Sequence, residues 1–420
     1  MVFVTMSSVY RHNHSTQYAD IGVLQLLNVT MFPMGFGESI LLHQGDSCLL
    51  VDCGSESKNK NDYFDNVVRE LEKYSKRSLL ISHFHMDHMN GIKYLYDHCP
   101  HGFDMVYLPS IFEKGDTSLE IIIIQHLNNA SKASDSYPIW NLLKDLIQSQ
   151  NKVRLIQRGD HFDGPACHFE ALWPIKDTTA ITLFTRTIHN SSNFVSALLQ
   201  DVSEVADNIR QIVQRMISTD DIATNYSKAA EELHGFEDNL EHLQNNFAKV
   251  MREAESSVEK KEIDKLFERI KKNEHSIVFH TLDNDHTQIL MTGDITSSGM
   301  NQIAKNCISK KKLFSPSIPL KTRYEEVKTP HHGIKYQTKK GFLEMAQLQD
   351  INRLLISNGE TPELRRGSIA EQYLISSSVK HVYCTNTICK RCEYLKKHKQ
   401  CADSCVNCKA GGVQINCVIP

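Results

Sequence analysis

The stretch SLLISHFHMDHMNG, residues 78–91, gathers side chains that bind metal ions. It holds His83, His85, Asp87 and His88, which are three imidazoles and one carboxylate within six residues. His83 and His85 stand two apart at the end of a predicted strand over 78–82, so we expect both imidazoles to project to one face. Imidazoles with a carboxylate bind first-row divalent metals, most naturally zinc. The plain alternative is a polar cluster on the surface.

Two further fragments could complete the same site. Asp294 closes the apolar segment ILMTGD, where a buried carboxylate without a partner would be costly. His331 and His332 follow another predicted strand, in TPHHG. Two carboxylates and this many imidazoles exceed the four ligands of one tetrahedral zinc ion. They suggest two metal ions, about 3.5–4 Å apart, bridged by an aspartate and a hydroxide.

The elements that must position these residues alternate along the chain. Apolar segments with glycine turns over 21–53 predict strands, and an apolar spacing of three and four predicts a helix over 62–75. Strands are expected at 78–82 and 105–110, with a helix at 91–98 between them. Two helices over 118–150 are followed by strands at 152–157, 167–174, 275–282 and 287–294. This alternation predicts a layered α/β domain.

Heptad-like apolar stripes interrupt that alternation and predict a long helical hairpin over 196–272, with its turn at 217–228. The chain therefore divides into a first half of the α/β domain at 1–195, a coiled-coil-like insertion at 196–272 and a second half at 273–420. The stripe could be a packing face. It could also be an arm for self-association or for a protein partner.

The motif HFHMDH, with LLVDCGS before it and ILMTGD and TPHHG after it, resembles the metallo-β-lactamase fold superfamily. The hairpin Gly37–Leu42 makes the chain more narrowly similar to the hydrolase domain of ComEC-type competence proteins, over roughly 20–185 and 273–385. The resemblance implies an αβ/βα four-layer sandwich whose metals lie at one edge between the two sheets.

The resemblance also implies a role for each residue. His83 and His85 would hold the first metal, Asp87 and His88 the second, and Asp294 would bridge the two. The remaining roles fall on His332 as a ligand, His331 near the leaving group, and Asp52 as a residue that orients the ligand loop. Asp87 and His331 are the residues expected to take part in catalysis.

The chain departs from the family pattern at two places. Asn273-Glu274-His275-Ser276 stands where the family usually has a third histidine, so either Asn273 or His275 could approach the first metal. Ile334 follows the HHG motif where the competence branch often has serine.

The expected activity is that of a dinuclear metal-dependent hydrolase, with two zinc or manganese ions. The superfamily cleaves several bond types, so the fold alone does not choose a substrate. The competence branch points to phosphodiesters, that is, to a phosphodiesterase or nuclease. Basic residues support phosphate binding; they are Lys305, Lys310, Lys311, Lys312, Lys321, Arg323, Lys390, Arg391, Lys396, Lys397 and Lys399. The alternatives are a hydrolase of a small ester, lactone or thioester, and a non-catalytic binding scaffold.

The C-terminal part is rich in cysteine, with seven of the 12 cysteines after residue 383. Cys389 and Cys392 form one CxxC pair, and Cys405 and Cys408 form another twelve residues later. This spacing predicts a zinc knuckle over 387–410 that binds one structural zinc ion. Buried or reactive free thiols are the alternative.

Composition limits the remaining classes. The formal net charge of −3 and the 40% hydrophobic content describe a globular chain without a general attraction for nucleic acid or membrane. No apolar run approaches the roughly 20 residues needed to cross a bilayer. The start of the chain lacks the pattern of a signal peptide, so a cytoplasmic protein is expected.

Overall fold

The protein is described by a computed structural model. The described residues are 27–57, 59–99, 102–113, 118–130, 139–165, 167–175, 193–218, 220–253, 275–282, 288–308, 320–334, 340–359, 373, 376–385 and 415–418. Asn273 and the cysteines of the expected zinc knuckle lie outside these residues.

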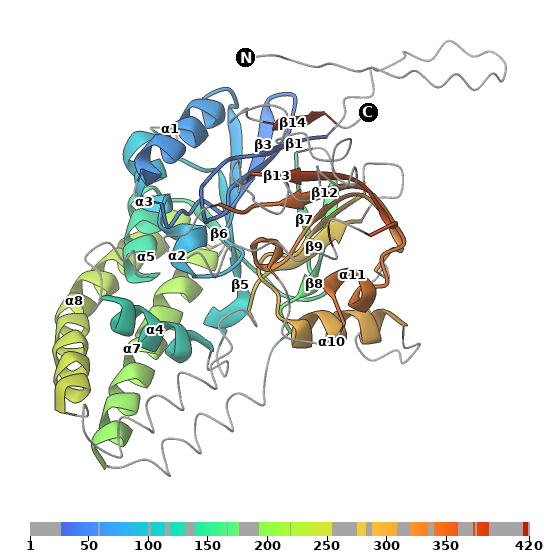
Figure 1. Ribbon diagram of the computed structural model, residues 1–420. Helices are drawn as coiled ribbons and strands as arrows, with labels where there is room; N and C mark the ends of the chain where they lie inside the picture. The colour runs from blue at the N-terminus through green and yellow to red at the C-terminus, as the bar shows by residue number, and fades with distance from the viewer. Residues whose placement is uncertain are drawn as a thin grey trace.

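Two seven-stranded sheets form the centre of the fold (Figure 1). In the first sheet, three neighbouring pairs, from β3 to β6, are parallel, and the other pairs are antiparallel. Its strands, in spatial order, are β14 (Ile415–Val418), β1 (Asn28–Met31), β2 (Ile40–Gln44), β3 (Ser47–Val51), β4 (Lys76–Leu80), β5 (Met105–Pro109) and β6 (Lys152–Ile156).

The second sheet repeats this mixed pattern, with parallel pairing from β10 to β13 and antiparallel pairing from β7 to β10. Its strands, in spatial order, are β13 (Val379–Cys384), β12 (Asp350–Ile356), β11 (Arg323–Lys328), β10 (Ile289–Met291), β9 (Val278–Thr281), β8 (His168–Trp173) and β7 (His161–Asp163).

The two sheets face each other across one apolar core, to which Ile40 and Leu42 contribute from β2 and Phe279 from β9. Residues one step along the same strands point outward, as the alternation of a strand requires, so Leu41 and Val278 belong to the two outer cores. Helices cover both outer faces. The order of layers is therefore helix, sheet, sheet, helix, in agreement with the α/β fold class predicted from the sequence.

The first outer face carries most of the helices. They are α1 (Lys60–Leu71), α2 (Met86–Met89), α3 (Ile92–His98), α4 (Ser118–Ala130), α5 (Ile139–Gln148), α7 (Asn193–Ile217) and α8 (Ile222–Glu253), with a 3-10 turn η1 (Ser110–Phe112). The second face carries α10 (Ser297–Ile308) and α11 (Phe342–Met345), and a 3-10 turn η3 (His331–Gly333) follows β11. None of the helices described is long and apolar enough to span a bilayer.

Helices α7 and α8 pack against each other and against α4 and α5. Their apolar stripes, which include Ile209 and Leu240, are buried in the outer core of the first sheet. The expected turn at 217–228 is too long, because α8 already begins at Ile222. Oδ1 of Asp221 accepts a hydrogen bond from the Thr224 N–H at 3.4 Å and so caps that helix. The expected hairpin continues to 272, but 254–272 lies outside the described residues.

The carboxyl ends of the parallel strands meet at one edge of the sandwich. Asp52 follows β3, and the 83–88 motif follows β4. In the second sheet Asp294 follows β10 and His331 follows β11. This convergence brings fragments more than two hundred residues apart in the sequence to a single place.

Two strand ends differ from the sequence-based expectation. β4 ends at Leu80 and β10 at Met291, so His83, His85 and Asp294 lie in the loops after the strands rather than at strand ends. The last strand, β14, pairs with β1 in the first sheet, although it comes after all strands of the second sheet. Short apolar segments do not reveal where ladder hydrogen bonds stop, which explains the two early strand ends.

Candidate metal centre

Residues 85–88, here called the ligand loop, follow β4 and enter the short helix α2, and backbone contacts fix them before any side chain contributes. The Cys53 N–H donates to the His88 carbonyl at 2.8 Å, and the Glu38 N–H donates to the Asp87 carbonyl at 2.9 Å. Gly54 permits this close approach, since a Cβ atom there would lie 2.3 Å from the carbonyl carbon of Asp87. The loop is therefore held directly against the end of β3.

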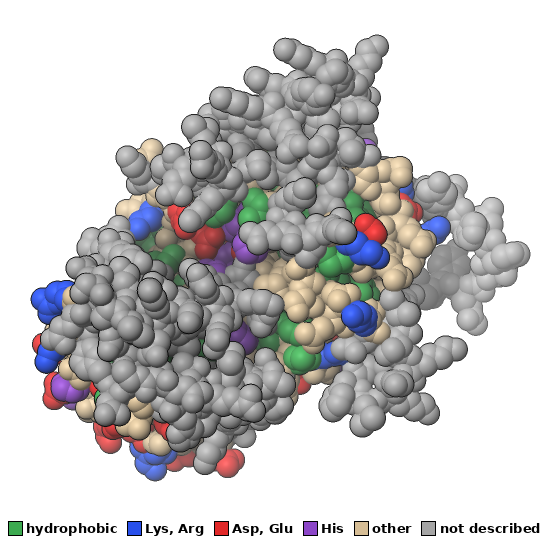
Figure 2. Space-filling view, turned by 60° about the horizontal axis from the view of Figure 1, so that its bottom comes forward, with side chains coloured by type: hydrophobic (Ala, Val, Ile, Leu, Met, Phe, Trp, Pro, Cys, Tyr) green, Lys and Arg blue, Asp and Glu red, His purple; other side chains and the backbone are tan. Residues whose placement is uncertain are grey.

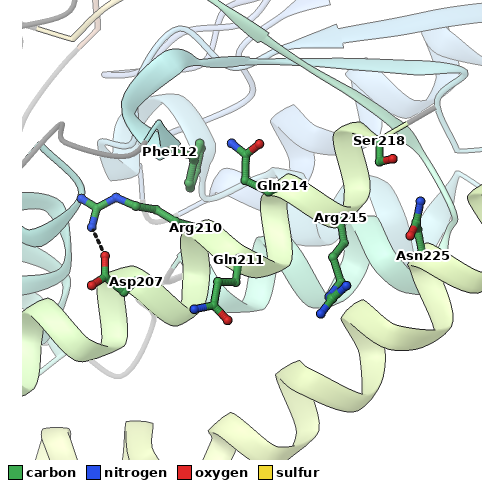
Figure 3. A pocket seen from close by; sticks show the side chains of 8 residues that line it. All are labelled: Phe112, Asp207, Arg210, Gln211, Gln214, Arg215, Ser218 and Asn225. Carbon is green, nitrogen blue, oxygen red and sulfur yellow. Dashed lines mark hydrogen bonds and ion pairs between the residues drawn. The ribbon is translucent and has the colours of Figure 1, made fainter. Parts of the chain in front are cut away.

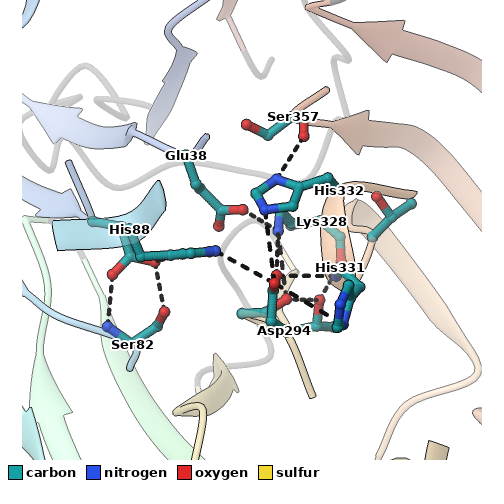
Figure 4. A network of polar contacts seen from close by, with 12 residues as sticks. Glu38, Ser82, His88, Asp294, Lys328, His331, His332 and Ser357 are labelled. Atoms are coloured by element: carbon teal, nitrogen blue, oxygen red, sulfur yellow. Dashed lines mark hydrogen bonds and ion pairs between the residues drawn. The ribbon is translucent and has the colours of Figure 1, made fainter. Parts of the chain in front are cut away.

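Four side chains from three parts of the chain come together at this edge (Figure 4). Asp87, His88, Asp294 and His332 each offer one ligand atom, and these four atoms all lie within 4.8 Å of one another. Nε2 of His332 lies 3.0 Å from Oδ2 of Asp87 and 3.7 Å from Oδ2 of Asp294. Nε2 of His88 lies 3.4 Å from the same Asp294 oxygen. Two imidazoles and two carboxylates thus face a common point.

His83 and His85 lie beside this group. Nε2 of His83 is 3.1 Å from Nδ1 of His85, and the His83 and His88 ring centroids are 4.1 Å apart. His83 is buried and His85 is half-buried. These two residues therefore lie next to the four-residue group without belonging to its 4.8 Å set.

Asp52 holds His88 from behind. Its Oδ2 lies 2.8 Å from Nδ1 of His88, and its two oxygens accept hydrogen bonds from the Ser82 N–H at 2.7 Å and the Ser82 hydroxyl at 2.6 Å. All three residues are buried. A carboxylate that accepts from Nδ1 leaves Nε2 of the same imidazole available to a metal ion.

His332 is oriented in the same way by backbone. Its Nδ1 donates to the Ser357 carbonyl at 2.9 Å, because a carbonyl oxygen can only accept. His331 and His332 both have left-handed backbone conformations, with φ of 54° and 53°. Such conformations are uncommon outside glycine and cluster at functional sites. The half-exposed His331 donates its backbone N–H to Oδ1 of Asp294 at 3.0 Å, and its Nδ1 is 4.0 Å from Oδ2.

The electrostatics of the cluster favour positive charge at its centre. Burial alone would raise the pKa of Asp294, but the His332 and His88 imidazoles hold it well below its usual range. Burial alone would lower the pKa of His88, but the carboxylates of Asp294 and Asp52 raise it well above its usual value. Asp294 is thus kept as an anion, and the electron pair with which His88 holds a proton so firmly can be offered instead to a divalent cation.

The donor set fits the metal ions that the sequence predicts. Nε2 of His88 is buried, makes no hydrogen bond among the described residues and faces Oδ2 of Asp294 at 3.4 Å, an arrangement that suits two ligand atoms of one metal ion. The nitrogen and oxygen donors suit zinc or manganese. Asp87, His88, Asp294 and His332 would hold one ion, and His83 and His85 are adjacent to it. His275 is half-buried and lies outside the four-residue group.

Two residues of the cluster were given no role from the sequence. Glu38 and Lys328 are both buried, and the Lys328 ammonium forms an ion pair with the Glu38 carboxylate. Both residues lie within motifs that mark the site, GESILL and VKTPHHG, but neither motif indicates that a lysine is buried there.

Acidic and histidine side chains also gather near the middle of the face drawn in Figure 2. A cavity of about 650 Å³ lies beside α7, away from this group of acidic and histidine side chains (Figure 3). Arg210 in its lining is paired with Asp207 and with Glu120, and Arg215 is paired with Glu232. Because these guanidinium groups are already neutralised, the cavity gives no sign of an anion site.

Comparison with known proteins bears on the same part of the chain. A family model described as the metallo-beta-lactamase superfamily matches residues 33–108, which include Glu38, Asp52 and the 83–88 motif. This match confirms the superfamily resemblance predicted from the sequence. Members of that superfamily are generally metal-dependent hydrolases. The narrower likeness to competence proteins stays a prediction. No curated protein matches this chain.

Two solved structures are similar in part. A protein of unknown function from Enterococcus faecalis V583 has 8% identity and a TM-score of 0.29, and the match covers 75% of this chain and 53% of that one. The MIM-2 metallo-beta-lactamase has 20% identity and a TM-score of 0.22, with 35% and 49% covered. The chain thus spans about half the length of each structure. At these TM-scores neither structure adds to the assignment.

Proposed function

We propose that this protein is a dinuclear metal-dependent phosphodiesterase or nuclease. The observation that carries the proposal is the meeting of Asp87, His88, Asp294 and His332, whose ligand atoms lie within 4.8 Å of one another. The four residues come from segments that follow three different strands: Asp87 and His88 from α2 after β4, Asp294 from the loop after β10, and His332 from η3 after β11. A purely structural polar cluster has no need to assemble this ligand set in the interior.

A pair of zinc or manganese ions, when bound, supplies a Lewis acid for the phosphoryl oxygen and a nucleophile at neutral pH. The chain's own residues prepare the site. Asp52 and the Ser357 carbonyl orient the imidazoles of His88 and His332. His331, with a side chain 37% exposed, is placed at the rim, where it can hold a proton for the departing oxygen.

The choice of a phosphodiester rests on two supports. The first is the likeness to competence-type hydrolases in the GESILL and TPHHG motifs. The second is the group of basic residues noted in the sequence, which includes Lys305 on α10. Such side chains bind phosphates along a polymer. Lys321 and Arg323 lie at the amino end of β11, away from the carboxyl end that carries the centre, and so do not add to this support.

The test uses purified full-length protein loaded with zinc or manganese. We expect it to cleave DNA, RNA or a generic aryl phosphodiester, and we expect Asp87→Ala/His88→Ala to lose that activity. Equal behaviour of the two proteins, with no cleavage of any of these substrates, would refute the proposal. Cleavage of small esters, lactones or thioesters alone would favour the alternative substrate class.

Metal counting tests the rest of the arrangement. About three zinc ions per chain would support two ions at the active site and one in the expected cysteine knuckle. A single ion, retained in Asp87→Ala/His88→Ala, would favour a scaffold whose knuckle and helices recruit a partner. The apolar stripes of the hairpin are buried in the outer core of the first sheet, so we propose that any protein partner contacts the exposed polar face of α8.

A further inference from the structure

A lysine lies in the interior beside the metal centre. Lys328, the last residue of β11, is fully buried. An ammonium group in the interior is costly unless it is paired. Lys328 Nζ forms an ion pair with Glu38, donates to the Gly293 carbonyl at 3.4 Å, and lies 3.9 Å from Oδ1 of Asp294 (Figure 4). The ammonium group therefore lies between Glu38, which precedes β2 of the first sheet, and Asp294, which follows β10 of the second.

Glu38 is held at this position by the ligand loop itself. Its N–H donates to the Asp87 carbonyl, and its own carbonyl accepts from the Gly54 N–H at 3.0 Å. Its carboxylate, together with Asp52 and His88, forms a second group whose ligand atoms lie within 4.8 Å of one another. The two ligand-capable groups share His88, which puts the Glu38 carboxylate directly beside the proposed metal centre.

Lys328 also distinguishes the two oxygens of Asp294. Oδ1 faces the lysine and accepts from the His331 N–H at 3.0 Å. Oδ2 faces Nε2 of His88 at 3.4 Å and Nε2 of His332 at 3.7 Å. The Lys328 ammonium and the His331 N–H thus face Oδ1, whereas Oδ2 faces the two imidazoles.

We propose that Lys328 is a positioning residue whose ammonium group supplies a fixed positive charge beside the metal centre. It neutralises Glu38 and so withholds that carboxylate from the metal centre, and it holds Asp294 so that only Oδ2 is presented to a metal ion. The inference rests on the proposed metal centre and deepens it, because it defines which carboxylates count as ligands.

The test is a titration of the metal-free, full-length protein with Co²⁺, followed by its visible d–d absorption, whose intensity falls as ligands are added. In Lys328→Met we expect Glu38 to join the ligands, so that the absorption weakens and Co²⁺ binds at least tenfold more tightly. In Lys328→Met/Glu38→Gln the added ligand is gone, and the absorption should return to the wild-type level. Lys380→Met, which breaks an exposed ion pair with Asp350 on the same sheet, is the matched control.

A wild-type spectrum and affinity in Lys328→Met would overturn the inference, and so would a double variant that keeps the altered spectrum. Should Lys328→Met fail to fold, Glu38→Gln and the double variant decide. In Glu38→Gln the Lys328 charge has lost its counter-ion, and Co²⁺ binding should weaken at least tenfold. In the double variant the lysine charge is removed as well, and Co²⁺ binding should be restored. Equal binding by these two variants contradicts the inference. If Asp294→Asn binds Co²⁺ as tightly as the wild type, the proposed function itself is refuted.

Discussion

Oδ2 of Asp52 lies 2.8 Å from Nδ1 of His88, and both side chains are fully buried. The Ser82 N–H and hydroxyl saturate the rest of this carboxylate, so it has no freedom to turn away. Asp52 itself adopts a left-handed backbone with φ of 60°. The orientation of one imidazole in the proposed centre therefore depends on a residue that need not contact the metal.

Asp52→Asn should weaken metal binding by roughly 10- to 100-fold while the protein stays folded. Asparagine tolerates the left-handed backbone, but its amide N–H₂ would face Nδ1 of His88 as a second donor. Isothermal titration of the metal-free protein with zinc measures the change. Asp46→Asn, in an exposed turn where the carboxylate accepts from the Ser75 N–H, is the control. Unchanged zinc affinity in Asp52→Asn would show that His88 does not depend on Asp52.

Removal of metal by a chelator should lower the melting temperature. An ion that binds only the folded state stabilises it by about 2.7 kcal/mol when its concentration is 100 times Kd. His332→Ala should lose the part of the zinc-dependent rise in melting temperature that comes from this centre. It should keep any part that comes from zinc bound to the cysteine-rich tail. Calorimetry with and without zinc measures both, and His234→Ala, at an exposed position of α8, should behave as wild type. A full zinc effect in His332→Ala would exclude His332 as a ligand.

Gly54→Ala should destabilise the protein by about 1–3 kcal/mol and impair metal binding more than its position in a loop suggests. The added Cβ would lie 2.3 Å from the Asp87 carbonyl carbon and 2.4 Å from the His88 nitrogen, so the ligand loop would have to move. Denaturant unfolding and zinc titration check the two effects. Gly159→Ala strains a left-handed backbone with φ of 87°, a strain that Gly54→Ala does not add, but its Cβ meets no atom within 4 Å, so it should leave zinc affinity unchanged.

Because of Glu326, the free energy of unfolding should fall as pH rises from about 4.5 to 8. Burial raises the pKa of Glu326 to about 8 from 4.5, although the Arg353 guanidinium lowers it. A raised folded-state pKa means that the folded protein keeps a proton that the unfolded chain releases, so this stabilisation is complete below pH 4.5 and is lost as pH approaches 8.

The slope expected from one such group is at most roughly 1.4 kcal/mol per pH unit. Urea unfolding at several pH values should therefore give a flatter profile for Glu326→Gln than for the wild type. Glu344→Gln, at an exposed position of α11, should keep the wild-type profile. Parallel profiles of the wild type and Glu326→Gln would contradict the assigned pKa.

Much of the ligand loop could be predicted from the sequence because its information is local. His83, His85, Asp87 and His88 are close in the chain, and the apolar segment before them predicts the strand that leads into the loop. The glycine-punctuated hairpin and the alternation of strands and helices likewise predict the α/β layers. The strand ends were less accurate, since β4 stops at Leu80 and not at residue 82, and β10 stops at Met291 and not at residue 294.

The residue types and their spacing determined which side chains could bind metal, because that chemistry belongs to the side chains themselves. Only the tertiary structure decided that Asp294 and His332 meet Asp87 and His88, since parallel strands from two sheets end at one edge. It also decided the role of Lys328, which reads in the sequence as an ordinary lysine. Lys328 is buried and paired with Glu38, which stands 290 positions earlier in the chain, and only the fold brings the two side chains together.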